Sequence, residues 1–70
     1  MPWTPEKPYV MRMFPLVSVK PRELFHATEA DQKQAFEREK RNGLYRQLWR
    51  GKGKSSDENT WTSLEAWSDD

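Results

Sequence analysis

The stretch "NGLYRQLWRGKGK", Asn42 to Lys54, combines the strongest apolar pattern of the chain with a run of basic residues. At about 100° per residue, four large side chains fall on one arc of a helix surface: Leu44, Tyr45, Leu48 and Trp49. Gly51 follows them, and glycine commonly ends helices. The spacing therefore predicts an amphipathic helix that ends at Arg50 and presents an apolar face.

The residues before this stretch also favour a helix. Thr28 is a good N-cap, and Asp31 stands three residues later in a capping-box-like spacing. From Glu29 onward the predicted helix is polar on nearly all sides, as in helices that bridge two bodies or lie in solvent. Asn42–Gly43 is either a C-cap or a flexible point in one continuous helix. We expect a helical region over residues 22–50.

Residues 1–21 contain all five prolines of the chain. Each proline fixes its own φ and pushes the preceding residue toward an extended conformation. Two strand-like runs, Tyr9–Phe14 and Leu16–Val19, flank Pro15, which argues against a central strand. The sequence predicts an extended, proline-rich arm laid along a partner.

The C-terminal part divides into a flexible linker at residues 51–60 and an acidic aromatic tail at residues 61–70. Thr62 to Glu65 fits a capping box, which favours one more short helix. The tail of this basic chain is acidic, because residues 55–70 hold five acids and no base. Opposite charges at the two ends suit a chain that meets two different surfaces.

The composition bounds the size of the core. The 70 residues include only five Leu, three Val, three Phe and no Ile, a low content of core-forming residues for a globular domain. Cysteine is absent and there is one histidine, so no disulfide or thiolate metal site can support the fold. The fold class expected is mostly α, with one central helix, an extended arm and little independent core.

Four Trp, two Tyr and three Phe are a heavy aromatic load for a chain of this kind. Large aromatic side chains carry much of the binding energy at protein interfaces. The predicted partner-binding residues are Trp3, Tyr9, Met11, Met13, Phe14, Phe36, Leu44, Tyr45, Leu48, Trp49, Trp61, Leu64 and Trp67. The predicted contacts with an anionic surface are Arg46, Arg50, Lys52 and Lys54.

Leu44-Tyr45-Arg46 resembles the signature of the LYR-motif proteins, small mitochondrial helical proteins that attach to iron–sulfur machinery or respiratory complexes. The resemblance covers three residues, and in that family the motif opens the first of three helices, whereas here it comes late in the chain. The resemblance implies that Leu44 and Tyr45 pack while Arg46 presents its charge. It also implies a peripheral mitochondrial location on the matrix side.

The sequence thus predicts a non-catalytic accessory subunit that bridges protein surfaces in a large complex, such as a respiratory-chain or ATP synthase complex. The alternatives are a small RNA- or ribosome-associated protein and a regulatory peptide that folds on its target. Contact with anionic lipid or RNA is part of the hypothesis, whereas a cofactor, a small-molecule substrate and a transmembrane segment are not. "GKGKSS" is no phosphate loop, because the required glycine is replaced by Leu48.

Overall fold

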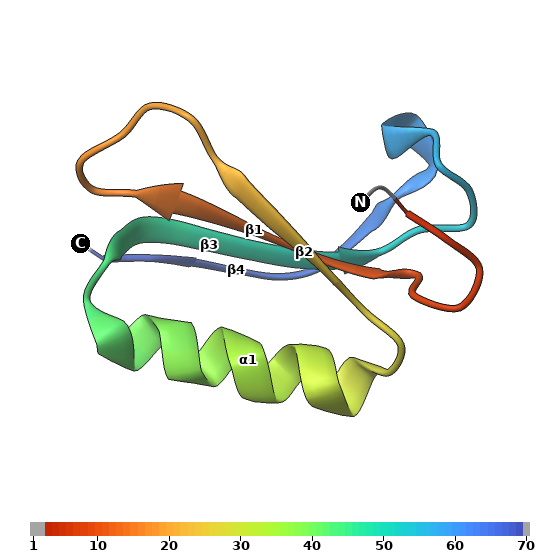
Figure 1. The fold of residues 1–70 in the computed structure, drawn as a ribbon, viewed down its shortest axis with the longest axis horizontal. Coiled ribbons are helices and arrows are strands. Elements are labelled where there is room, and N and C mark those ends of the chain that lie inside the picture. Colours follow the sequence, from red (N-terminus) through yellow and green to blue (C-terminus); the bar gives the residue numbers. More distant parts are fainter. Residues whose placement is uncertain (1–2, 70) are drawn as a thin grey trace.

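Four antiparallel strands and one α-helix form the fold in the computed structural model, which describes residues 3–69 (Figure 1). Predictions that involve Pro2 or Asp70 lie outside the described residues. In chain order the elements are β1 (Tyr9–Pro15), β2 (Arg22–His26), α1 (Glu29–Asn42), β3 (Tyr45–Lys52), the short 3₁₀ turn η1 (Glu58–Thr60) and β4 (Thr62–Ser68). The strand order is β2-β1-β3-β4, so β1 and β3 are central.

The prediction of a mostly helical chain is wrong, and β3 shows why. Phe14 of β1 pairs with Gln47, but Pro15 pairs with Tyr45, which leaves Arg46 as an extra residue in β3. Such a β-bulge changes which face the following side chains point to. Tyr45 and Leu48 therefore reach the same core although they are three residues apart. The bulge hides the two-residue period of the strand and produces a spacing that resembles a helix.

A second bulge explains the incorrect prediction of a C-terminal helix. Arg50 pairs with Glu65 and Gly51 with Ser63, which leaves Leu64 as the extra residue of β4. Trp61, Leu64 and Trp67 stand at three-residue intervals, a spacing that fits a helical turn as the capping box does. Residues 62–68 instead form an edge strand of the sheet.

The predicted N-terminal arm and the start of the helical region also need correction. Tyr9–Pro15 is a strand as predicted, but it is central, with β2 on one side and β3 on the other. Pro15 is tolerated because it is the last residue of β1. Arg22–His26 forms the edge strand β2, where a short helix was expected after Pro21.

The start of α1 agrees with the predicted N-cap, and its end decides between the two alternatives at Asn42–Gly43. The Thr28 hydroxyl accepts a hydrogen bond from the Asp31 amide at 3.2 Å, which is the predicted N-cap. Gly43 has φ 70°, and this left-handed conformation ends the helix at the C-cap position. Asn42–Gly43 is therefore a C-cap, and the chain turns there into β3.

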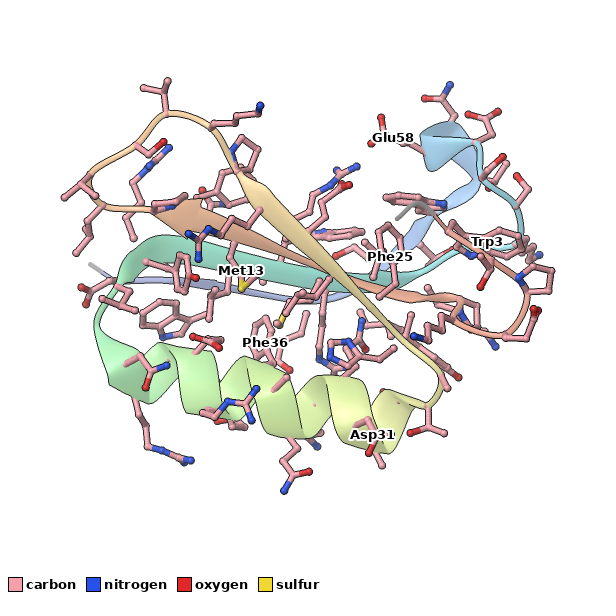
Figure 2. All side chains as sticks on the ribbon, in the orientation of Figure 1. Trp3, Met13, Phe25, Asp31, Phe36 and Glu58 are labelled. Atoms are coloured by element: carbon pink, nitrogen blue, oxygen red, sulfur yellow. The ribbon has the colours of Figure 1, made fainter. Side chains whose placement is uncertain are left out.

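The chain has a core of its own between α1 and one face of the sheet, contrary to the expectation of little independent core. Its residues are Met11, Met13, Ala35, Phe36, Tyr45 and Leu48, with Trp67 packed against them. Figure 2 shows Met13 and Phe36 between the sheet and α1. Met, Tyr and Trp replace the missing aliphatic residues, because flexible thioethers and large rings fill the same space.

Candidate docking surface

A buried polar network attaches α1 to the sheet. Gln32 is fully buried, and its Nε2 donates to one carbonyl oxygen of β1 at 2.7 Å and one of β3 at 2.9 Å. Its Oε1 accepts from Arg50, which also forms ion pairs with Glu29 and Glu65, each at 3.1 Å. Arg50, predicted to contact an anionic surface, is 6% exposed and has its partners within the chain.

The face of the sheet opposite α1 carries a second group of large side chains, the open-face cluster of Trp3, Phe25, Trp49 and Trp61 around Arg12. The Arg12 guanidinium lies 5.3 Å from the Trp49 ring centroid and 5.0 Å from that of Trp61. These distances are typical of cation–π contacts. Phe25 meets Trp61 edge to face, with centroids 6.0 Å apart.

Most polar groups of the open-face cluster are also satisfied within the chain, although the buried indole nitrogen of Trp3 has no hydrogen-bond partner among the described residues. Arg12 donates to Glu23 at 2.7 Å and forms a second ion pair with Glu58 of η1. The Trp61 indole N–H donates to the Ser55 carbonyl oxygen at 2.9 Å. These bonds hold the η1 segment against the sheet, on the side away from α1 (Figure 1). The cluster therefore resembles a second small core rather than an open stacking platform.

The structure distributes the predicted partner-binding residues over three environments. The fully or nearly fully buried ones, which pack in the core under α1, are Met11, Met13, Phe36, Tyr45 and Leu48. The half-buried ones are Trp3, Tyr9, Phe14, Trp49, Trp61 and Trp67. Only Leu44 and Leu64 are exposed. Most of these side chains are thus packed within the chain itself.

The four cations predicted to contact an anionic surface do not form one patch. Arg50 is buried beneath α1, whereas Arg46 and Lys52 stand at opposite ends of β3. The Lys52 ammonium lies over the Tyr9 ring, 5.3 Å from its centroid. Lys54 is exposed beyond the end of β3. This separation weakens the RNA hypothesis, which needed the four charges together.

The two most exposed of the large apolar residues in the described chain, Val17 and Val19, lie in the loop between β1 and β2. We call residues 16–20 of this loop the hairpin tip. Val17 is 97% exposed, Val19 94% and Leu16 55%. The sequence analysis placed a strand-like run here but no partner-binding residue. A signal was available: Pro15 and Pro21 bracket the loop and prevent regular strand pairing, so its aliphatic side chains have no element that could bury them.

Two shallow grooves adjoin the hairpin tip. One of about 260 Å³ lies between Val17, Lys20, Arg22 and the exposed Leu44. The other, of about 390 Å³, lies on the Arg46 side of the loop. Each groove combines an aliphatic wall with at least one cation.

His26 is the one histidine of the sequence, and it lies at the end of β2. Burial lowers the pKa of His26; Asp31 opposes this shift, and the positive charges of Arg38 and Lys7 add to it. Its Nδ1 is buried without a hydrogen-bond partner.

Within residues 3–69 no three His, Asp or Glu side chains are grouped so that they could hold a metal ion. The helices in that range are too short or too polar to cross a bilayer.

Comparisons with protein-family models, with curated proteins and with solved structures find no match for this chain. The fold class that the structure defines is a small antiparallel ββαββ sheet with one helix on one face. Any functional argument therefore depends on the surfaces of this chain itself.

Proposed function

We propose that this chain is a non-catalytic docking module, an accessory component that attaches to a larger assembly through its hairpin tip. The observation that carries the proposal is the exposure of Val17 and Val19, at 97% and 94%. Two β-branched side chains at the end of a hairpin gain almost no burial within the chain. Binding to another body would remove their apolar surface from water.

The rest of the chain supports attachment at this one place. Most of the aromatic side chains that could have served as anchors have contacts within the core or the open-face cluster, and Tyr9 and Phe14 lie against Lys52 and Arg46. Leu44, 59% exposed, borders the groove beside Val17 and extends the apolar surface. The placement of the assembly in a mitochondrial respiratory or ATP synthase complex remains a prediction from the sequence.

The experiment compares the wild-type chain with a tip variant, Val17→Ser/Val19→Ser, in gentle lysates of the source cells. Size-exclusion chromatography of the tagged proteins separates a large assembly from a free chain of 8.4 kDa. Leu64→Ser is the matched control, because Leu64 is also exposed, at 42%, but lies in β4.

The wild type and Leu64→Ser are expected in the large fraction, and the tip variant at the position of the free chain. A tip variant that stays with the assembly would show that attachment uses another surface. A wild type that elutes as a free monomer and is also absent from the membrane pellet of the same lysate would reject the docking function altogether.

A further inference from the structure

The hairpin tip has apolar side chains in its loop and basic side chains at its base. The aliphatic side chains of Leu16, Val17 and Val19 are in the loop and are exposed. Lys20 and Arg22 follow where the chain returns into β2. This order, apolar at the end and basic at the base, is the pattern by which peripheral segments sit at a bilayer interface.

Arg46 of β3 is a third cation at the base of the tip. As the bulged residue of β3, it directs its guanidinium to the carbonyl oxygen of Pro15 at 2.5 Å and to that of Ser18 at 3.5 Å. It also lies over the Phe14 ring, 5.9 Å from the centroid. The charge is therefore fixed beside the loop before any partner arrives.

The cations at the tip differ in their ion pairs from Arg12 and Arg50, the arginines on the two faces of the sheet. Arg12 and Arg50 each contact two carboxylates. Within residues 3–69, neither Lys20, Arg22 nor Arg46 forms an ion pair. Their positive charge remains available to an external anion.

Among residues 3–69, Asp69 brings a carboxylate near the base of the tip. The Asp69 amide donates to the Arg46 carbonyl oxygen at 3.0 Å, so a carboxylate follows β4 at this end of the sheet. It is on the strand next to β3, whereas Val17 and Val19 are in the loop that leads from β1 to β2. The net charge of Lys20, Arg22, Arg46 and Asp69 together is positive.

We propose that the hairpin tip inserts into the headgroup region of an anionic lipid bilayer. Leu16, Val17 and Val19 enter the apolar boundary, and the cations Lys20, Arg22 and Arg46 contact lipid phosphates. This inference rests on the proposed docking function and names the surface that the module meets. A fluid bilayer accepts a protruding aliphatic loop without a matching pocket, and its negative charge complements the base of the tip.

Two other occupants fit the observations less well. A nucleic acid would contact the cations, but it offers no apolar phase for Val17 and Val19, and the aromatic rings suited to base stacking are packed in the open-face cluster. A protein partner would need a pocket complementary to the loop, and nothing in the chain specifies its shape. A protein occupant is therefore an outcome of the test.

The test uses single-cysteine labelling. The sequence has no cysteine, so the fluorophore reacts at the introduced position alone. Val17→Cys and the control Leu64→Cys each carry an environment-sensitive fluorophore. Each is mixed with vesicles of phosphatidylcholine alone or of phosphatidylcholine with phosphatidylserine. The label at position 17 is expected to shift to the blue and brighten only with phosphatidylserine, and the label at position 64 to stay unchanged.

Sedimentation with the same vesicles measures the contribution of each group. Lys20→Gln and Arg22→Gln should each weaken binding to phosphatidylserine vesicles about fivefold. In high salt the effect of each substitution should be smaller, because the charges are screened. Val17→Ser/Val19→Ser should lose about tenfold or more, because both apolar side chains leave the interface. Equal binding to both vesicle types, or no change at position 17, would overturn the lipid inference.

The two proposals fail in different ways. If the tip variant leaves the cellular assembly but wild type ignores both vesicle types, the docking function stands and its occupant is a protein. If the tip variant remains in the assembly, the docking function itself is rejected.

Discussion

The open-face cluster and the hairpin tip are two apolar regions outside the core under α1, and they differ in how their surface is covered. In the cluster, Trp61 meets Phe25 edge to face, stacks with Arg12 and donates its indole N–H to a carbonyl oxygen. In the tip, Val17 and Val19 are almost completely exposed. The side chains of the cluster pack against other residues of the chain, whereas those of the tip remain exposed to water.

This difference shows how a chain with few aliphatic residues uses its large side chains. Rings with a polar atom can pack on a half-open sheet face, because they bury apolar area and keep a hydrogen bond at once. The aromatic residues therefore build a second small core. The aliphatic residues that cannot be packed at the proline-bracketed loop are left for contacts outside the chain.

The largest expected effect comes from Trp61→Ala, which removes the centre of the open-face cluster. We expect the free energy of unfolding to fall by about 2–4 kcal/mol, somewhat less than for a fully buried tryptophan, because Trp61 is half-buried. A domain of this size has only about 3–5 kcal/mol in total, so most of its stability would be lost. Urea denaturation followed by far-ultraviolet circular dichroism measures the change.

Trp61→Phe serves as the control, because it keeps a ring in the same place and loses the indole hydrogen bond. Its loss should be clearly smaller than that of Trp61→Ala. An unchanged midpoint for Trp61→Ala would mean that the cluster adds nothing to folding, and the contrast with the tip would disappear.

Gly51→Ala tests how closely the cluster approaches the backbone. A Cβ at Gly51 would meet the Trp49 ring and lie 2.5 Å from the backbone oxygen of Thr62, which cannot move without disturbing the β3–β4 pairing. We expect a loss of about 2–3 kcal/mol from this overpacking, measured by thermal unfolding.

Gly43→Ala separates packing from backbone strain. Nothing lies within 4 Å of the Cβ position at Gly43, but its φ of 70° disfavours any other residue. A loss of about 1 kcal/mol is expected there from the left-handed conformation alone. Equal losses for both variants would argue against a tight approach of Trp49 to β3.

Arg12→Gln removes the cation from the cluster and leaves Glu23 and Glu58 without it. The two cation–π contacts are worth about 0.5–1 kcal/mol each at partly exposed sites, so a loss of about 1–2 kcal/mol is expected in the free energy of unfolding. Arg12→Lys should recover only part of this loss, since an ammonium lacks the planar guanidinium that stacks on both rings. Full recovery by lysine would indicate that charge alone matters.

The smallest expected effect is that of Val17→Ser/Val19→Ser on stability. Both side chains are already in water, so the free energy of unfolding should change by no more than about 0.5 kcal/mol. Urea denaturation of the variant also shows that any loss of docking is not a loss of fold. A decrease of more than about 1 kcal/mol would mean that the tip is packed within the chain, contrary to the comparison.

The local signals of the sequence were sufficient for the start of α1 and for the alternation of β1, whereas they left open whether the helix ends at Gly43 or continues to Arg50. Thr28 and Gly43 set the ends of the helix through their own side chain and backbone. Met11 and Met13 lie on the core face together, as the strand period requires. These features depend on residues close in the chain, so local rules describe them.

The sheet could not be predicted in the same way. Arg46 and Leu64 become bulged residues only through pairing with strands far away in the sequence, and each bulge turns a strand pattern into a helical spacing. The candidate site was missed for a related reason. Leu16, Val17 and Val19 were part of a run that looked able to pair, whereas the aromatic side chains looked available for a partner.

By itself the sequence determined the N-cap of the helix, the absence of disulfides, and a heavy aromatic content beside few Leu and Val residues. The tertiary structure decided which of these aromatic and aliphatic side chains are covered. Burial depends on long-range strand pairing, which places Trp61 over Arg12 and leaves Val17 in water. The stretch from Asn42 to Lys54 illustrates this division: its composition fits an amphipathic helix, and its partners β1 and β4 make it a central strand.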